Sequence, residues 1–371
     1  MSHFDIAIIG AGMAGASLAA ELADSRSVLL LEAEDQPGYH STGRSAALWH
    51  ETYGGPAVQP LTSASGPFLR APPADFSERS FLVPRGALNI GRADEGVTMD
   101  AMERDFAGTG VVLERLDRAA IAAMVPGLKE GWNDAIWEPD CADIDVGALH
   151  GAFLGKARHA GVEVRTRAGL RSARYAGGHW ALETAAGEHT SALLVNAAGA
   201  WADDVARMAS VGAAGIQPYR RTMVQLRVDP PSSDQLPLVR GIDGSFYFRP
   251  ESGGRIWLSP HDETPTDACD AAPEELDVAI AIARMEEVVD WTIKGVERKW
   301  AGLRSFAPDR LPVIGRDPMV PDFFWFAGQG GFGIQTAPAA AWLARALILE
   351  QALPPVLSGV DPARYDPDRL A

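Results

Sequence analysis

Residues 4–15 read FDIAIIGAGMAG, and residues 28–32 read VLLLE. The order is an apolar strand, a glycine-rich turn, an alanine-rich helix and a second apolar strand that ends in an acid. Gly10 permits a tight turn, Gly12 lets a pyrophosphate approach the backbone, and Gly15 lets the helix pack closely on the strand. With Ala14, these residues place a pyrophosphate at the helix N-terminus, where free N–H groups and the dipole favour negative charge. The stretch predicts a unit that binds a dinucleotide.

Glu32 closes the second strand, where a carboxylate binds the ribose hydroxyls of the nucleotide. Its charge would repel a 2′-phosphate, so FAD or NAD is favoured over NADP. A glycine motif alone also occurs where only tight packing is required. Here strand, motif, helix, second strand and acid follow in the required order, which favours nucleotide binding.

Three further small-residue segments indicate a flavin. Residues 38–47, GYHSTGRSAA, follow the ribose acid and could carry main chain to an isoalloxazine ring; residues 196–201, NAAGAW, follow an apolar strand at 192–195. Residues 328–336, GQGGFGIQT, are predicted to open a helix that continues to residue 349. A helix start of this kind would stabilise the anionic N1/O2 edge of a reduced flavin. The alternative is glycine turns that serve packing alone, and their number favours FAD.

Length and composition restrict the class of protein. A chain of 371 residues exceeds what one core usually supports, so two domains are expected. With 47% hydrophobic and 22% charged residues the composition is that of a globular enzyme, and a net charge of −16 argues against nucleic acid and membrane partners. Cys141 and Cys269 cannot form a disulfide framework, and no signal peptide is expected, so a cytoplasmic location is predicted. Neither cysteine lies in a cofactor segment, which predicts noncovalent FAD.

The rest of the chain predicts a second sheet. Strand-like spacing occurs at residues 81–90, 131–138, 222–228, 245–248 and 255–259, which suggests antiparallel pairing. Helices are predicted at 99–106, 118–124, 144–159 and 273–289, a further strand at 162–166, and a crossing between domains in the proline-rich residues 56–75. The expected fold class is α/β, with a Rossmann-like FAD-binding domain and an α+β domain on an antiparallel sheet.

Substrate chemistry is assigned to Arg304, the pair Arg220 and Arg221, Tyr53 and Tyr247. A guanidinium offers a rigid fork for a carboxylate, and each charge-assisted contact contributes about 1.5 to 3 kcal/mol. Arg304 lies in an apolar context, where a charge needs a partner; its alternative is a structural salt bridge. Neighbours in a strand point opposite ways, so only one of the arginine pair can face a cleft. The tyrosines could equally be packing residues.

These segments resemble the FAD-dependent D-amino acid oxidase and glycine oxidase family, and within it the bacterial D-amino acid dehydrogenases of the D-arginine dehydrogenase type. The resemblance covers nearly the whole chain. It is carried by residues 10–15, 36–47, 142–145, 195–201, 300–306 and 329–336.

The resemblance implies a discontinuous FAD-binding domain at residues 1–75, 142–215 and 296–371, and a substrate-binding domain at 76–141 and 216–295. It further implies that Arg304, Tyr53 and Tyr247 hold the substrate carboxylate, with Arg221 as the partner from the arginine pair, and that the Gly331 carbonyl meets the amine. The implied cofactor-binding residues are Gly10, Gly12, Ala14, Gly15, Glu32, Ser41, Thr42, Gly43, Arg44, Ser45, Ala46, Val164, Ala198, Gly199, Trp201, Gly302, Gly330, Gly331, Phe332, Gly333, Ile334, Gln335 and Thr336.

The reaction implied is hydride transfer from the α-carbon to flavin N5, which gives an imino acid and then a 2-oxo acid and ammonia. It needs no metal, and His50 and His261 lack ligand spacing, so they are interpreted as surface or packing residues. Three electron acceptors stay open: oxygen, a quinone or a carrier protein. Where arginine-preferring relatives carry a histidine and a glutamate, this chain has Leu48 and Ala87. Neutral or apolar side chains are therefore expected to be preferred over cationic ones.

Other functions remain open from the sequence. A glycine, sarcosine or other secondary-amine oxidase, or a 2-hydroxy acid dehydrogenase, would use the same fold and cofactor. A flavin-dependent domain in tRNA modification is disfavoured by the acidity of the chain. A purely structural nucleotide-binding role would leave the arginines and tyrosines without a purpose.

Overall fold

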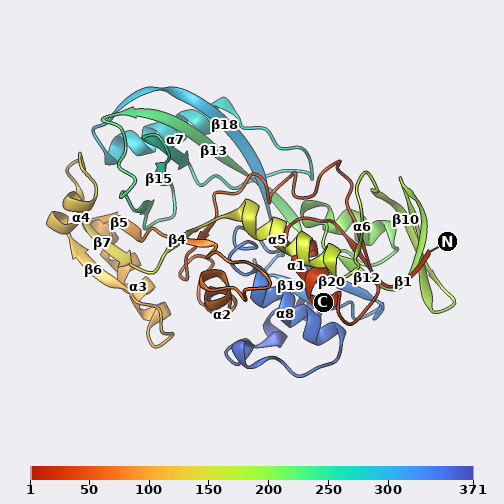
Figure 1. Ribbon diagram of the computed structural model, residues 1–371. Helices are drawn as coiled ribbons and strands as arrows, with labels where there is room; N and C mark the ends of the chain where they lie inside the picture. The colour runs from red at the N-terminus through yellow and green to blue at the C-terminus, as the bar shows by residue number, and fades with distance from the viewer. Residues whose placement is uncertain (1, 371) are drawn as a thin grey trace.

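The protein is described here by a computed structural model of residues 2–370, which contains two large β-sheets (Figure 1). The first is eight-stranded, and its central strands are parallel. Their order is β20 (Phe323–Ala327), β12 (Gly187–Asn196), β1 (Ser2–Ile9), β2 (Val28–Leu31) and β9 (Glu163–Arg165). The antiparallel strands are β10 (Leu170–Ala176), β11 (His179–Thr184) and β19 (Val313–Arg316).

The parallel strands form because their side chains are apolar on both faces. Along β1, Ile6 and Ile8 enter one core while Ala7 and Ile9 enter the other, as the two-residue period of a strand requires. The first core is covered by α1 (Met13–Leu22), α5 (Val146–His159) and α8 (Ala337–Ile348), and the second by α6 (Ala202–Met208). The predicted strand–helix–strand unit is confirmed.

The second sheet is nine-stranded and mostly antiparallel; it forms the lobe at the upper left of Figure 1. Its order is β17 (Thr264–Pro265), β13 (Gln217–Asp229), β16 (Arg255–Ser259), β15 (Tyr247–Glu251), β14 (Leu238–Gly241), β5 (Ala87–Arg92), β7 (Trp132–Glu138) and β6 (Glu114–Asp117), with β18 (Thr292–Phe306) along β13. The helices of this lobe are α3 (Gly96–Phe106), α4 (Arg118–Met124) and α7 (Glu275–Val288). The expected antiparallel sheet, and with it the fold class, is confirmed.

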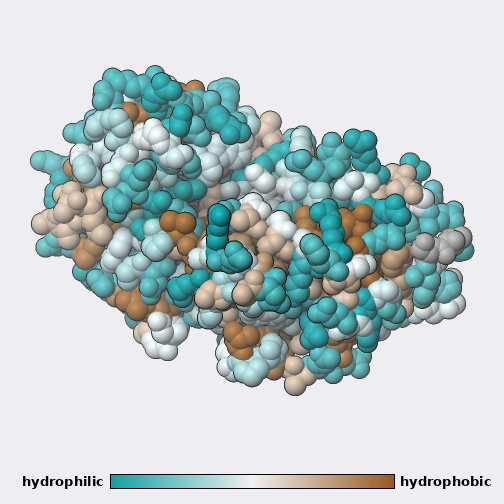
Figure 2. Space-filling model, in the orientation of Figure 1, coloured by the Kyte–Doolittle hydropathy of each residue, from teal (hydrophilic) through white to brown (hydrophobic). Residues whose placement is uncertain are grey.

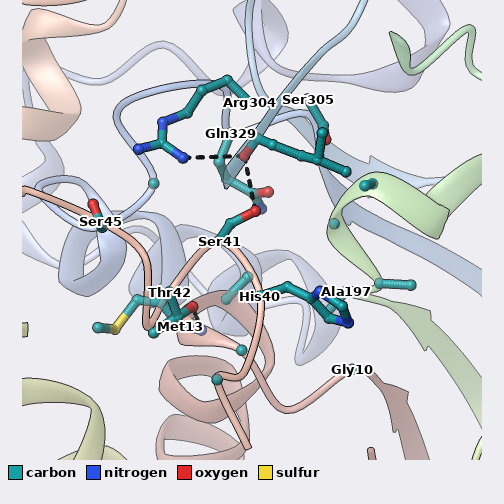
Figure 3. A pocket seen from close by; sticks show the side chains of 18 of the residues that line it. Gly10, Met13, His40, Ser41, Thr42, Ser45, Ala197, Arg304, Ser305 and Gln329 are labelled. Carbon is teal, nitrogen blue, oxygen red and sulfur yellow. Dashed lines mark hydrogen bonds between the residues drawn. The ribbon is translucent and has the colours of Figure 1, made fainter. Parts of the chain in front are cut away.

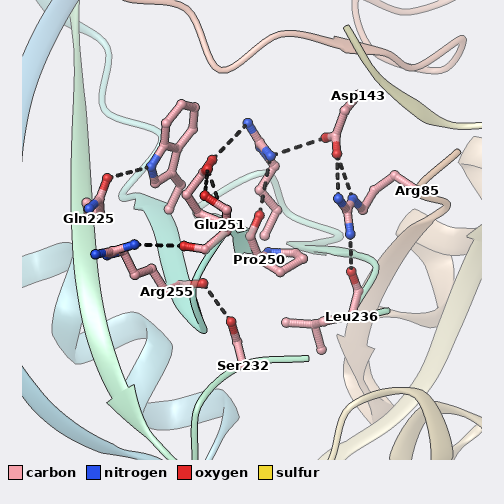
Figure 4. Close-up of polar contacts among 11 residues, drawn as sticks. Arg85, Asp143, Gln225, Ser232, Leu236, Pro250, Glu251 and Arg255 are labelled. Atoms are coloured by element: carbon pink, nitrogen blue, oxygen red, sulfur yellow. Dashed lines mark hydrogen bonds and ion pairs between the residues drawn. The ribbon is translucent and has the colours of Figure 1, made fainter. Parts of the chain in front are cut away.

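A small third sheet lies between the large ones and consists of β3 (Leu48–Trp49), β8 (Ala142–Ile144) and β4 (Leu82–Pro84). Asp143 of β8 ties it to the nine-stranded sheet, because its carboxylate binds Arg85 at 2.6 Å and Arg249 at 3.4 Å (Figure 4). Both β18 and this sheet cross the predicted domain boundaries, and the division into domains stays a prediction. Short 3₁₀ turns complete the chain at Ala93–Glu95, Gly199–Trp201, Pro355–Leu357, Pro362–Arg364 and Pro367–Leu370.

Three predicted elements were wrong. Residues 56–75 are not a crossing but contain α2 (Gln59–Arg70), whose Leu61 and Leu69 are buried in the first core. The helix predicted from residue 328 begins at Ala337, and the glycine segment before it is a series of turns. The strand predicted at 81–90 is divided into β4 and β5 because Gly86, with φ of +71°, turns the chain there.

The surface shown in Figure 2 is predominantly hydrophilic, with hydrophobic residues scattered over it in small groups. Within residues 2–370, every helix is too short or too polar to span a lipid bilayer.

Candidate functional site

A groove runs along the carboxyl ends of the parallel strands, where sheets of this type bind ligands. Turns after β1, β2, β12 and β20 line it, together with the segment that contains Ser41, Thr42 and Ser45 (Figure 3). The predicted cofactor residues that line it are Gly10, Gly12, Ala14, Glu32, Ser41, Thr42, Ser45, Ala198, Gly199, Trp201, Gly330, Gly331, Gly333 and Ile334. Segments far apart in the sequence therefore form one surface.

The turn after β1 requires its glycines. Gly10 has φ of +99°, and a Cβ there would lie 2.5 Å from the carbonyl oxygen of Ala197. A Cβ at Gly15 would lie 1.9 Å from the Gly10 carbonyl oxygen. These contacts bring α1 against β1 and β1 against the turn after β12, so that N–H groups at the helix start face the groove.

Glu32 and Thr42 stabilise this turn by hydrogen bonds from its backbone to their side chains. The Glu32 carboxylate accepts hydrogen bonds of 3.0 Å from the backbone N–H groups of Ala11 and Glu34, and the Thr42 hydroxyl accepts one of 3.0 Å from Met13. Glu32 is largely buried at the groove wall. Its charge is thus held where a ribose could meet it.

The other predicted cofactor residues lie outside the groove. Gly15, Gly43, Phe332 and Thr336 hold the turns, and Ala46 and Gln335 line the neighbouring cavity. Arg44 is turned away, because its guanidinium pairs with Asp270 and donates to the carbonyl oxygens of Ala271 and Ala301. Val164 packs in β9 against the first core. Gly302 lies in β18, where a Cβ would be 3.2 Å from Nη1 of Arg304. Each of these residues supports the site without lining the groove.

A second cavity adjoins the groove and shares Ser45, Arg304, Gly331 and Ile334 with it. The five residues predicted to contact substrate all line this cavity: Tyr53, Arg221, Tyr247, Arg304 and Gly331. The remaining lining residues are Ala46, Ala47, Leu48, His50, Leu238, Arg240, His261 and Gln335. The cavity therefore lies between the nine-stranded sheet and the glycine segment after β20.

Arg304 is a buried cation without an anionic partner among residues 2–370. Its side chain is 8% exposed, its one hydrogen bond within residues 2–370 goes to its own neighbour, the Leu303 carbonyl, at 3.2 Å, and no carboxylate lies within ion-pair distance (Figure 3). Burial and the neighbouring charge of Arg221 lower the pKa of Arg304. An unpaired buried guanidinium is costly, and an anionic ligand at the boundary of groove and cavity would stabilise it.

Arg221 is held differently. It donates to the Asp262 carbonyl at 2.8 Å and to Glu263 at 3.0 Å, and its neighbour Arg220 points away to Glu274 and Asp277. Burial alone would lower the pKa of Arg221, but Tyr53, Tyr247 and Glu263 raise it. Arg221 is therefore held in place as a cationic side chain that lines the cavity.

The two tyrosines bracket the cavity. A Cβ at Gly331 would lie 2.2 Å from the Tyr53 hydroxyl, so only glycine leaves room for that ring. The Tyr247 hydroxyl lies 3.0 Å from the sulfur of Met223, and burial raises the pKa of Tyr247. Both tyrosines line the cavity together with Arg221 and Arg304.

Comparison with known proteins shows the family to which this chain belongs. Residues 5–347 match the model of the DAO family, described as FAD dependent oxidoreductase. The chain belongs to the DAO family. The fold and the glycine turns fit FAD, and the family confirms FAD as cofactor and FAD-dependent oxidoreductase as enzyme class.

Relatives in the DAO family are named for different activities. The chain is 25% identical to the bifunctional protein ThiO/ThiG of Synechocystis over 97% of its length but spans only 54% of that protein, about half. It is 24% identical to glycine oxidase of Geobacillus kaustophilus, and the match covers 94% of each chain. The crystal structure of glycine oxidase from that organism superposes with a TM-score of 0.85 at 22% identity; the superposition covers 99% of this chain and 98% of the other. L-proline dehydrogenase from P. horikoshii superposes with a TM-score of 0.84 at 23% identity, covering 98% of each chain.

Sequence reasoning missed two features of this DAO-family cavity. His50, interpreted as a surface or packing residue, is buried and pairs with the buried Glu138 at 3.1 Å, which also accepts from Thr52 and Glu51 at 2.7 Å. Burial alone would raise the pKa of Glu138, but these partners lower it. His261 also lines the cavity and donates through Nδ1 to the Gly244 carbonyl. No motif spacing marks these histidines. Within residues 2–370 no cluster could hold a metal ion.

His261 gives this protein a pH-dependent stability. Burial and the charges of Arg221 and Arg240 lower the pKa of His261 from 6.5 to about 2. Below pH 6.5 the unfolded chain binds a proton that the folded chain does not, so the free energy of unfolding falls as pH decreases toward 2. Between about pH 7.5 and 5.5, we expect the free energy of unfolding to fall by about 1 kcal/mol less in His261→Gln than in the unmodified protein. Urea unfolding with FAD bound measures this difference.

The matched control for this measurement is His159→Gln, a change of an exposed histidine at the end of α5. It should leave the pH dependence unchanged. Equal pH dependence in the His261 variant and the unmodified protein would show that His261 does not titrate in this way.

Proposed function

We propose that this protein oxidises a D-amino acid to an imino acid, which water converts to a 2-oxo acid and ammonia, and that neutral or apolar side chains are favoured over cationic ones. The observation that carries the proposal is Arg304, a buried guanidinium that has no anionic partner among residues 2–370 and lies where the dinucleotide groove meets the cavity. An α-carboxylate supplies the missing charge. The D configuration of the proposed substrate rests on the resemblance of the sequence to D-amino acid dehydrogenases of the D-arginine dehydrogenase type.

Arg304 would take the carboxylate in a fork of two hydrogen bonds, with the Tyr53 and Tyr247 hydroxyls as further donors. The carbonyl of Gly331, which packs close to the Tyr53 hydroxyl, would accept from the amine. FAD, when bound, supplies the hydride acceptor. These contacts fix the α-carbon between the sheet and the glycine segment, and such orientation supplies much of the rate.

The proton balance is simple. Oxidation removes a hydride from the α-carbon and one proton from nitrogen, which leaves a C=N bond. The amine must therefore bind neutral, and a cavity walled by Arg221 and Arg304 disfavours an ammonium. Hydrolysis then adds water across the C=N bond and releases ammonia. No side chain has to act as a strong base.

The side-chain preference rests on the opposite wall. Leu48 and Leu238 line the cavity, and Ala87 is fully buried behind them with Cys141. Within residues 2–370 no carboxylate among the lining residues could meet a cationic side chain. Burying such a charge would be costly, so D-arginine and D-lysine should be poor substrates.

The test is anaerobic mixing of the FAD-bound protein with D- and L-amino acids, glycine, sarcosine, L-proline and 2-hydroxy acids, following loss of oxidised-flavin absorbance. Bleaching by neutral D-amino acids, with D-arginine slower by about tenfold or more, is the expected result. D-Arginine as the best substrate would refute the side-chain preference. Bleaching only by glycine, sarcosine, proline or a hydroxy acid would replace the proposed reaction by a secondary-amine or hydroxy-acid oxidation.

A further inference from the structure

The cavity contains a third arginine that the proposed reaction does not use. Arg240 lies in β14 and lines the cavity together with Arg221 and Arg304. Its Nη1 donates to the Asn89 side chain at 3.2 Å, while its buried Nε has no hydrogen-bond partner within residues 2–370. Arg240 thus has one side-chain hydrogen bond and an unpaired Nε within residues 2–370, and a buried guanidinium nitrogen without a partner is a costly feature unless a ligand completes it.

The carboxylates near this cavity are all engaged elsewhere. Glu138 is saturated by His50, Thr52 and the Glu51 N–H, and Glu263 binds Arg221 at 3.0 Å and Arg310 at 2.8 Å. Asp262 accepts from the backbone and hydroxyl of Thr222 at 2.7 and 2.9 Å, and Asp243 accepts from the Ser245 N–H at 2.9 Å. Among residues 2–370, neither Arg240 nor Arg304 has a carboxylate within 4.0 Å. Within residues 2–370 neither cation therefore has an ion-pair partner, although Asp243 and Glu138 act on Arg240, and Asp262 on Arg304, at longer range.

The sheet separates these two cations. β14 carries Arg240 directly opposite Tyr247 of β15, and the order continues through β16 to β13, along which β18 carries Arg304 opposite Tyr219. β14 and β18 are separated in the sheet by β15, β16 and β13, and the side chains of Arg240 and Arg304 nevertheless line one cavity. Arg240 Nη2 turns toward Gly244, beside His261, where a Cβ would lie 3.2 Å from it. The two guanidiniums therefore approach a ligand from different sides.

We propose that Arg240 binds a second carboxylate, so that an amino acid with two carboxylates is the preferred substrate. This inference rests on the proposed function and adds acidic side chains to its neutral ones. Arg304 takes the carboxylate next to the reacting carbon, and Arg240 takes the distal one. His261 lines the cavity and donates through Nδ1 to the Gly244 carbonyl, and with its pKa lowered to about 2 it adds no charge that would compete for either carboxylate. A substrate with two carboxylates pairs with both Arg304 and Arg240, whereas a substrate with a neutral side chain leaves Arg240 without an ion-pair partner.

The first measurement is binding of ligands that cannot be oxidised. Glutarate, succinate, butyrate and valerate are titrated against the FAD-bound protein by calorimetry and by perturbation of the flavin spectrum. We expect the dicarboxylates to bind about tenfold or more tightly than the monocarboxylates of equal length. Arg240→Met should bring the two classes within about twofold, and Arg240→Lys should keep part of the difference.

The matched control is Arg298→Met, which removes an exposed arginine from β18 of the same sheet outside the cavity. It should leave the preference for dicarboxylates unchanged. FAD content and urea unfolding of each variant establish that the protein is folded. If Arg240→Met does not fold, Arg240→Gln, which keeps a donor but removes the charge, tests the same point.

The second measurement separates this inference from the proposed function. Anaerobic kcat/KM is compared for D-glutamate, D-aspartate, iminodiacetate, D-glutamine and D-norvaline in the unmodified protein and in Arg240→Met. A preference for acidic substrates that Arg240→Met abolishes supports the inference, and the best of the three acids identifies the compound class. Oxidation of neutral D-amino acids with no such preference overturns the role of Arg240 and leaves the proposed function standing. Oxidation of none of them overturns the proposed function itself, whatever the dicarboxylates bind.

Discussion

Arg304→Leu is expected to lower kcat/KM for the preferred amino acid by about a thousandfold while leaving the folded protein as stable as before, or slightly more stable. The guanidinium has no anionic partner within residues 2–370, so its removal breaks no ion pair and relieves the cost of a buried charge. The same change deletes two charge-assisted contacts to the substrate carboxylate, each of about 1.5 to 3 kcal/mol. Anaerobic kinetics and urea unfolding of one preparation measure both effects.

Arg221→Leu is the matched variant in the same cavity. It removes hydrogen bonds to the Asp262 carbonyl and Glu263, so it should destabilise the fold by about 1 to 3 kcal/mol. Arg304→Lys should recover only part of the activity, because an ammonium cannot form the fork. A large loss of stability in Arg304→Leu with activity retained would identify Arg304 as a structural residue and would remove the main support for carboxylate binding.

Gly10→Ala is expected to abolish retention of FAD. The added Cβ would lie 2.5 Å from the Ala197 carbonyl oxygen and 3.1 Å from Cα of Ala198, both backbone atoms of the turn after β12. Neither can move without displacing the second glycine turn of the groove, and φ of +99° is itself unfavourable for alanine. We expect the purified variant to be colourless and its affinity for added FAD to fall by about a hundredfold or more, measured by quenching of flavin fluorescence.

The control isolates the steric part of this effect. Gly161 has a similar φ of +92°, lies before β9, and a Cβ there would meet no atom within 4 Å. Gly161→Ala therefore introduces the backbone strain of about 1 kcal/mol but no steric clash. We expect this variant to retain FAD. Normal FAD binding by Gly10→Ala would mean that the groove does not depend on the close approach of the two turns.

Much of the cofactor site was predictable because its chemistry is local. A glycine turn between a strand and a helix needs particular backbone angles within a few residues, and those angles are encoded by residues such as Gly10 and Gly15 themselves. The same holds for Glu32, which follows its strand directly. The prediction for residues 56–75, which depended on their proline content, failed, because burial of Leu61 and Leu69 produced a helix there.

The substrate cavity was only partly predictable. Arg304, Tyr53, Tyr247 and Arg221 could be named as chemical types that bind a carboxylate, and the structure brings them to one cavity. Arg240 could not be named, because nothing in its neighbours along the chain distinguishes it from a surface arginine. Its environment arises from β5, β14 and β15, which are separated by long stretches of sequence and meet only in the sheet.

By itself, the sequence determined the dinucleotide turn, the apolar segments that form strands, and the residue types available to bind a carboxylate, since each depends on residues that are near neighbours in the chain. Only the tertiary structure decided which cations are paired. Among residues 2–370, Glu263 pairs with Arg221 and His50 pairs with Glu138, whereas Arg240 and Arg304 have no carboxylate within ion-pair distance. Charge pairing depends on distances of a few ångströms between residues remote in sequence, and folding alone sets those distances.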